Sequence, residues 1–412
     1  MKLKILSLIL FIFIIRISSI GLDTKLIGYG LIFVFFLFLA GYSFFIVERL
    51  EGFLSSTLSK VFVLFFLMSC LSSIAAIYYG LPIIDSGVAL FKLVIVFMII
   101  YFSYLCGLSN SALIYFKVII FSLFIHVLLG VVLQPFGYTQ EIHGTFRLTG
   151  LVGGVQVYAN IAMLLFVFSM LSIILKDHLV FSKGWLLIFV IVSLIAMVMS
   201  NTLKNFAAAL LTISFLFFVD FRKALKWLVP IGALFIVCSP FIYSWFVDSD
   251  IYARLIVVWD AGIKTELAPG EKLESSLVWR FIHWSKLFND WSQNYYLTGA
   301  GFGQITNVNG LKTPSGRGYE AHSDLVTIIL EFGLLFIIPV LYCFYTLFTH
   351  PLKLYSSTHI KLFRVLFLCG ISLIISSSFG NVFYSLACMY FFWFFVGWSE
   401  GYAKRYLYVR KI

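Results

Sequence analysis

The sequence predicts an all-α polytopic membrane protein, and three observations support this fold class. Of the 412 residues, 62% are hydrophobic and 11% are charged, whereas a soluble domain carries about 25% charged residues. The mean hydropathy is +1.04. A membrane-spanning helix needs roughly 20 mostly apolar residues, and the chain contains about twelve such stretches.

The predicted spans follow from these apolar stretches, taken in order. We place them at residues 4–20, 27–47, 61–79, 87–106, 111–133, 157–175, 184–200, 206–220, 227–247, 325–349, 365–379 and 383–399. The first resembles a signal peptide, but Arg16 interrupts it and no small-residue cleavage site follows, so we expect a retained helix. The six cysteines show no paired spacing, which predicts neither a disulfide framework nor a metal site.

Lysine and arginine predict the orientation. With twelve alternating spans and both termini in the cytoplasm, the short external loops hold only Lys25, Arg147 and Lys204. The cytoplasmic side then collects most of the basic residues, as the positive-inside rule requires. These are Lys2, Lys4, Arg49, Lys60, Lys176, Lys183, Arg222, Lys223, Lys226, Lys353, Lys361, Arg364, Lys404, Arg405, Arg410 and Lys411. The net charge of +11 is therefore attributed to topology, and no nucleic-acid partner is expected.

The chain divides into three parts. Residues 1–247 form a membrane domain with nine spans, residues 248–324 form a long external loop, and residues 325–412 form a second membrane domain with a cytoplasmic tail. Within the loop, residues 275–291 predict an amphipathic helix that lies on the membrane surface. Its apolar residues recur at helical spacing: Leu277, Phe281, Trp284, Phe288 and Trp291. A long connection rich in aromatic residues favours function over disorder.

His322 is the strongest candidate for chemistry. It follows a glycine-rich run and stands at the mouth of span 325–349. It is either an ordinary interfacial histidine or a base, since imidazole titrates near neutrality. Glu320 and Asp324 are close enough in sequence to orient it or to raise its pKa.

One acidic residue, Glu331, lies inside the same span. An ionised carboxylate there is costly and normally faces a cavity or a partner. We expect Glu331 to be protonated, or paired with Lys92 or Lys117 in other spans.

Three external cations could bind phosphate. Arg280 borders the apolar stripe of the surface helix, where it either snorkels to headgroups or clamps a lipid-linked phosphate with its planar fork. Lys204 in "SNTLKNFAA" and Arg147 in "GTFRLTG" are either interfacial charges or further phosphate contacts. Arg317, in "PSGRGYEA", is a supporting candidate.

The sequence gives little sign of metal or nucleotide binding. It contains no HExxH motif and a single Asp-x-Asp pair, Asp248 and Asp250, and we expect chemistry without metal or cofactor. The run "GAGFG" resembles a phosphate loop only superficially, because it lacks the lysine and the strand-to-helix setting. Its glycines are more consistent with a tight turn or close backbone approach to a ligand.

The order of these motifs resembles the O-antigen ligase and polymerase superfamily of bacterial polysaccharide assembly. The resemblance covers the whole architecture, and its motifs gather in residues 275–335: Arg280 with Trp284, then "LTGAGFGQ", then "AHSDLVTIILEFGLL". The stretch "FRLTGLVGGVQVYANIA" is similar to the family's Arg-x-x-Gly segment.

The resemblance implies an inverting, metal-independent sugar transfer from undecaprenyl pyrophosphate at the periplasmic face of the bacterial inner membrane. It implies that His322 activates the acceptor hydroxyl, and that Arg280 and a cation between spans seven and eight hold the pyrophosphate. The chain departs from the family at the second cation, where Lys204 replaces a Ser-Arg pair. It departs again at Ser323, where the family has asparagine.

Three functions remain open. The high Phe and Ile content and the reduced Ser-Arg motif favour a polymerase that joins lipid-linked repeat units in the bilayer, for which a chain-length regulator is a candidate partner. The alternative is a ligase that transfers the polymer to lipid A–core. A transporter without catalysis is less favoured, because the charges within the spans are few: Arg16, Lys92, Lys117 and Glu331.

Overall fold

The structure is a computed structural model that describes residues 47–137, 139–142, 145–150, 154–216, 276–313, 316, 318–383 and 386–411. The predicted spans 4–20 and 227–247 lie outside these residues, as do nearly all of span 27–47 and the first part of the external loop.

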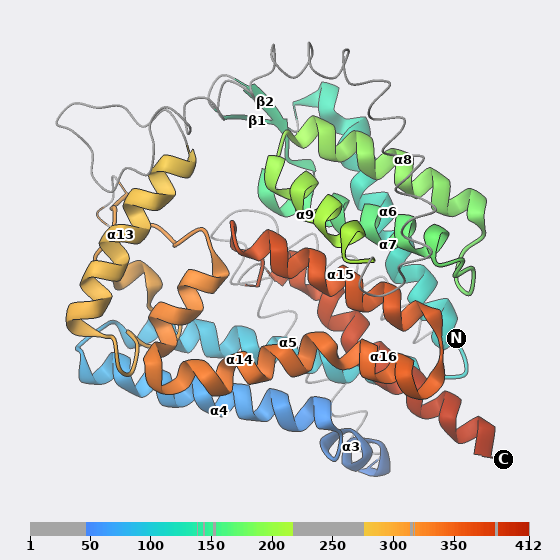
Figure 1. Cartoon of the computed structure of the whole chain (residues 1–412), viewed down its shortest axis with the longest axis horizontal. Helices are drawn as coiled ribbons and strands as arrows, with labels where there is room; N and C mark the ends of the chain where they lie inside the picture. The colour runs from blue at the N-terminus through green and yellow to red at the C-terminus, as the bar shows by residue number, and fades with distance from the viewer. Residues whose placement is uncertain are drawn as a thin grey trace.

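The described elements are almost all helical (Figure 1). In chain order they are α3 (Val47–Leu54), α4 (Thr57–Tyr78), α5 (Ile83–Leu108), α6 (Ala112–Leu133), η1 (Gln134–Phe136), β1 (Thr139–Ile142), β2 (Thr145–Leu148), α7 (Val155–Ile174), α8 (Lys183–Ser200), α9 (Leu203–Ser214), α13 (Ser276–Asn294), η3 (Ile305–Asn307), α14 (Asp324–Thr358), α15 (Lys361–Ser377) and α16 (Leu386–Lys411).

Six of the described helices are long and apolar enough to cross a membrane: α4, α5, α6 with η1, α7, α8 and α14. This supports a multi-pass helical membrane protein. Helices α4 to α9 and α15 correspond to predicted spans within a few residues, and α13 corresponds to the predicted surface helix. Helices α14 and α16 extend well beyond the predicted ends of spans 325–349 and 383–399, and α3 matches no predicted span.

The core forms around α7 and around the pair α5–α16. In α7, 16 of the 20 residues are buried, because this helix is apolar on all sides. Helices α5 and α16 approach closely at glycines: a side chain on Gly397 or Gly401 would collide with the α5 backbone at Ile100 or Tyr104. Small residues allow this spacing between apolar helices.

Helix α14 changes direction near its first third. Gly333 has φ +60 inside the helix, a backbone conformation that L side chains rarely adopt. Its backbone meets Gly299 of the preceding loop so closely that a Cβ on either glycine would collide with the other segment. Gly299 is one of the glycines expected to permit a tight turn or a close approach to a ligand, and here it brings loop 299–304 against α14 of the same chain.

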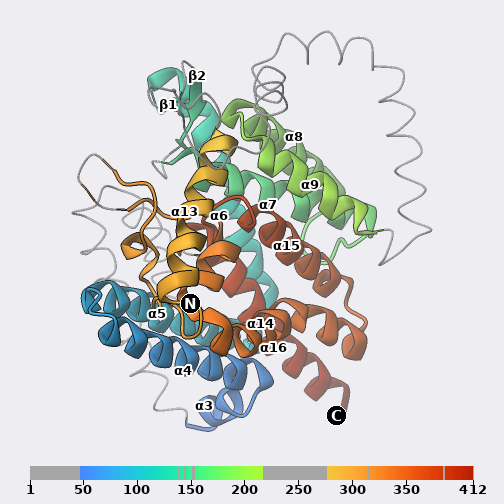
Figure 2. The ribbon, with the colours of Figure 1, turned by 60° about the vertical axis from the view of Figure 1, so that its left-hand side comes forward.

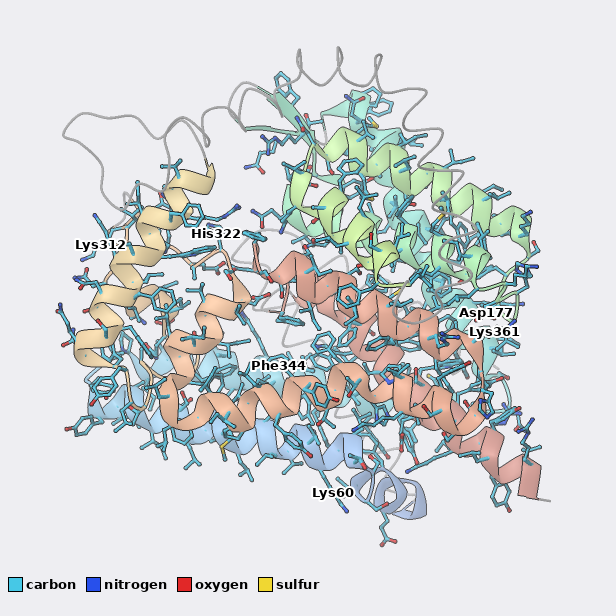
Figure 3. The ribbon with its side chains drawn as sticks, viewed as in Figure 1. Lys60, Asp177, Lys312, His322, Phe344 and Lys361 are labelled. Carbon is cyan, nitrogen blue, oxygen red and sulfur yellow. The ribbon has the colours of Figure 1, made fainter. Side chains whose placement is uncertain are left out.

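The bundle has two distinct ends (Figures 1 and 2). Helix α13 and the β1–β2 hairpin lie at one end, and the C-terminus lies at the other. The hairpin, with Thr139 paired to Leu148 and Ile142 to Thr145, was not predicted from the sequence. Figure 3 shows His322 at the α13 end, while Asp177 and Lys361 lie at the opposite end.

Candidate functional site

The backbone around His322 is fixed on both sides. Ser323 caps α14 by accepting a hydrogen bond from the Val326 N–H at 3.3 Å. On the other side, Trp284 of α13 donates its indole N–H to the Ala321 carbonyl at 2.6 Å. Between these anchors His322 has φ +52, an uncommon conformation for a residue other than glycine. The two anchors hold the imidazole beside α13.

Aromatic rings surround the imidazole. Trp279 of α13 lies edge-to-face with His322 at 5.3 Å between ring centroids and with Tyr319 at the same distance. Its ring stacks on His283 at 4.9 Å. Burial lowers the pKa of His283 to about 4, and its Nδ1 accepts the Leu311 N–H at 3.0 Å. His283 is therefore neutral and serves to hold Trp279 against His322.

Two cations from distant parts of the chain act on His322. Burial lowers the pKa of His322, and the charge of Arg280 on α13 lowers it further. The Glu320 carboxylate opposes this by raising the pKa, and Lys204 on α9 lowers it. Burial also lowers the pKa of Arg280 itself, although a guanidinium stays charged. The imidazole is thus neutral near pH 7 and lies within the field of two positive groups.

Lys204 reaches this end of the molecule because a buried polar cluster fixes α9. The Ser376 hydroxyl of α15 lies 2.8 Å from Oδ1 of Asn160 and 3.1 Å from Oδ1 of Asn205. This cluster joins α7, α9 and α15, and its α9 member, Asn205, is the residue that follows Lys204. The Lys204 ammonium lies against Gly380, where any side chain would collide with it.

The two acids beside His322 hold the connection between α15 and α16. Asp324 is fully buried, and its Oδ2 accepts the N–H groups of Val382 and Phe383 at 2.6 and 2.8 Å. Asn381 donates its side-chain amide to Glu320. Of these two acids, Glu320 raises the pKa of His322 as its sequence position suggested, whereas the hydrogen bonds of Asp324 go to the backbone of residues 382–383.

The remaining predicted residues lie in different places. Arg147 lies on β2, opposite Gln140, and β2 packs against α7 and α8. Arg317 is outside the residues that the structure describes. Glu331 is fully buried and lines the same cavity as Lys92, while Lys117 lines a separate groove between α6 and α8. Of the two lysines expected to pair with Glu331, Lys92 is the one that shares its surroundings.

In α13, the predicted surface helix, the most buried residues are not those of the predicted apolar stripe. The fully or nearly fully buried residues of α13 are Val278, Ile282, His283 and Leu287. Residues of the predicted stripe, such as Trp284, Phe288 and Trp291, are partly buried and pack at the edge of a small core formed with loop 300–308 and the start of α14. Trp279 and His283 are four residues apart and therefore lie on the same face of α13, with Arg280 between them in the sequence. This spacing could have identified the two rings as neighbours from the sequence.

Within the described residues, no group of three or more His, Cys, Asp or Glu side chains lies together as a metal site would require. In comparisons with known proteins, no family model and no curated protein matches the chain.

Proposed function

We propose that the protein is a metal-independent glycosyltransferase of bacterial surface-polysaccharide assembly, which takes its donor oligosaccharide from undecaprenyl pyrophosphate. One observation carries the proposal: a neutral imidazole, His322, lies within the electrostatic influence of two cations from separate elements, Arg280 and Lys204. His322 lies at one end of a bundle that contains membrane-length apolar helices (Figure 3).

The arrangement suits displacement of a diphosphate by an alcohol. As the glycosidic bond breaks, negative charge develops on the leaving pyrophosphate, and preorganised cations stabilise it without reorganisation. Arg280 can bind two phosphate oxygens with its fork, while Lys204 supplies a point charge. The incoming hydroxyl must lose a proton, and a neutral His322 can accept it.

The reaction balances with these groups alone. The acceptor oxygen forms a bond to the anomeric carbon as the bond from that carbon to the pyrophosphate oxygen breaks. His322 takes the hydroxyl proton, and the carrier leaves as its diphosphate. Attack from the face opposite the leaving group inverts the anomeric configuration.

Proteoliposomes containing the purified protein and a synthetic lipid-linked repeat test this proposal. We expect wild-type protein to join the repeats and His322→Ala to lose at least about a hundredfold in rate, which is the usual contribution of a general base. Full turnover by His322→Ala would reject the catalytic role. Tyr319→Phe, a conservative change beside the histidine, is the matched control.

Polymerase is the form that the sequence favours, with ligase as the alternative. The two accept different hydroxyls, so a chromosomal deletion separates them. Loss of a polymerase leaves lipopolysaccharide with a single repeat, whereas loss of a ligase leaves core alone and accumulates lipid-linked polymer. A transporter would leave polymer formation in proteoliposomes at background.

A further inference from the structure

A cavity of about 120 Å³ with a mixed polar and apolar lining lies next to the proposed catalytic group, on the side of Glu320. It is formed where the start of α5, the loop through η3, the first turns of α14 and the α15–α16 connection meet. Its polar lining includes Asp85, Lys92, Glu320, Thr327, Glu331 and Asn381.

The cavity shares a wall with the His322 site. Glu320 lines it and also acts electrostatically on His322. Asn381 lines it too and donates a hydrogen bond to Glu320. The Asn381 side-chain oxygen is buried and has no hydrogen-bond partner among the described residues. A buried acceptor without a partner is uncommon and points to a ligand or water that would satisfy it.

The walls of the cavity are well anchored. Asp85 accepts the Asn307 side-chain amide at 2.9 Å, and Glu331 accepts the Ile305 N–H at 3.2 Å. Gln304 ties η3 to α5 through the Ser86 hydroxyl at 2.8 Å. A cavity held by such long-range bonds is largely pre-formed, which lowers the cost of binding a ligand.

We propose that this cavity is the subsite for the acceptor sugar, an inference that rests on the proposed function. The lining combines carboxylates, an amide, two hydroxyls and one ammonium, which are the hydrogen-bonding partners that sugar hydroxyls need. Apolar surface from Val88 and Ala89 completes the wall, where the C–H groups of a sugar ring pack. A cavity of about 120 Å³ suits a single sugar unit and not an oligosaccharide.

Charge separates this subsite from the donor. The lining holds three acids and one lysine, so it repels a diphosphate. The cations Arg280 and Lys204 instead act on His322. The charges that act on His322 therefore include two cations, which suit the leaving diphosphate, and Glu320, which also lines a cavity that suits an uncharged or amino sugar.

Direct binding tests the subsite without relying on transfer. The probe is the carrier-free oligosaccharide that mild acid releases from the host's lipid-linked repeat, and its binding to detergent-purified protein is followed by saturation-transfer NMR. Val88 is 44% exposed, so Val88→Phe can fill the cavity mouth without disturbing the core. Ile83→Phe is the matched control, since Ile83 is exposed on another side of α5 and does not line the cavity.

We expect Val88→Phe to weaken oligosaccharide binding by about tenfold or more because the new ring occupies the cavity mouth, and Thr327→Val to weaken it by about tenfold because a polar contact is lost. Ile83→Phe and Arg280→Met should bind it as wild type does. Equal affinity of Val88→Phe and Ile83→Phe, or an equal loss in Arg280→Met, would overturn the assignment. Thr327→Val removes one hydroxyl from the lining with little change in volume, which guards against a folding defect in the larger variant.

The transfer assay in proteoliposomes distinguishes the two proposals. If transfer occurs and Val88→Phe leaves the KM for the acceptor unchanged, the subsite is wrong and the proposed function stands. If wild-type protein binds the oligosaccharide but transfers nothing, the proposed function is wrong, and so is the acceptor role of the cavity, although it binds sugar.

Discussion

At the scale of single residues, the surroundings of His322 determine its protonation. Burial and two cations outweigh one exposed carboxylate, so its pKa lies below the ordinary value of about 6.5. A group with a lowered pKa stays neutral down to more acidic pH. The base form of His322 is therefore present throughout the neutral range and is lost only as the pH falls through the lowered pKa.

The pH profile of transfer follows from this sign. We expect the acidic limb of kcat/KM to have its midpoint below about pH 6.5. Glu320→Gln removes the one carboxylate that raises the pKa, so it should move the limb to still lower pH. Glu51→Gln, an exposed acid in α3, should leave the limb in place. A limb above pH 6.5, or an upward shift in Glu320→Gln, would contradict this account.

The Arg280 fork makes a second prediction at this scale. Arg280→Lys keeps the positive charge but loses bidentate binding of phosphate oxygens. The loss of one charge-assisted hydrogen bond should lower kcat/KM for the lipid-linked donor by about tenfold. Lys286→Arg, an exposed change on the same helix, is the control and should have no effect. Wild-type kinetics in Arg280→Lys would show that the fork makes no difference.

At the scale of elements, the contact between loop 299–304 and α14 shapes the cavity side of the site. Gly299 and Gly333 both have positive φ and meet backbone to backbone. The Gly301 N–H donates to the Glu331 carbonyl at 3.2 Å, and the Ala300 N–H donates to the Leu330 carbonyl at 2.9 Å. These bonds replace those that the kink removes from α14 and keep buried polar groups satisfied.

Gly299→Ala tests this contact. The new Cβ would collide with the Glu331 backbone, and alanine would have to adopt the positive φ of Gly299, which L side chains disfavour. We therefore expect the free energy of unfolding to fall by about 2 kcal/mol or more. Gly87→Ala is the control, because a Cβ there meets nothing within 4 Å and alanine favours the interior of α5. Apparent Tm values in detergent should therefore fall for Gly299→Ala and hold or rise for Gly87→Ala. Equal Tm values in both variants would mean that loop 299–304 shifts to make room for the Cβ, and would contradict a rigid contact with α14.

At the scale of the whole molecule, the two ends of the bundle differ in chemistry. The end opposite His322 joins several segments through basic residues: Lys404 donates to the Gly52 carbonyl at 2.8 Å, and Arg405 donates to the Ser109 carbonyl at 2.6 Å. There Glu400 lies 2.9 Å from His350 and 3.3 Å from Lys404. A basic end of this kind is typical of the cytoplasmic side.

Cysteine labelling tests this orientation. Lys60 and Lys312 are exposed and lie at different ends of the bundle (Figure 3). In a background without the native cysteines, a membrane-impermeant maleimide should label Lys312→Cys in intact spheroplasts, and Lys60→Cys only after permeabilisation. Labelling of Lys60→Cys in intact spheroplasts would reverse the orientation and remove the site from the periplasm.

The sequence by itself determined which segments are helical and that the chain belongs in a membrane, because both follow from the length and spacing of apolar runs. It also singled out Arg280 on the predicted surface helix and His322 at the start of the next span as candidate site residues. Only the tertiary structure decided which side chains surround His322. Lys204 joins it through a cluster of Asn160, Asn205 and Ser376, and such pairing between distant helices leaves no periodic signal in the sequence.

The same reason explains the cavity. Its lining comes from α5, η3, α14 and the α15–α16 connection, and each residue taken alone reads as an ordinary interfacial or helix-end polar group. The kink at Gly333 and the bonds of Asp324 to residues 382–383 bring those segments together. Hydrophobic pattern determines which segments enter the membrane, but close backbone contacts and buried hydrogen bonds determine which polar groups face one another there.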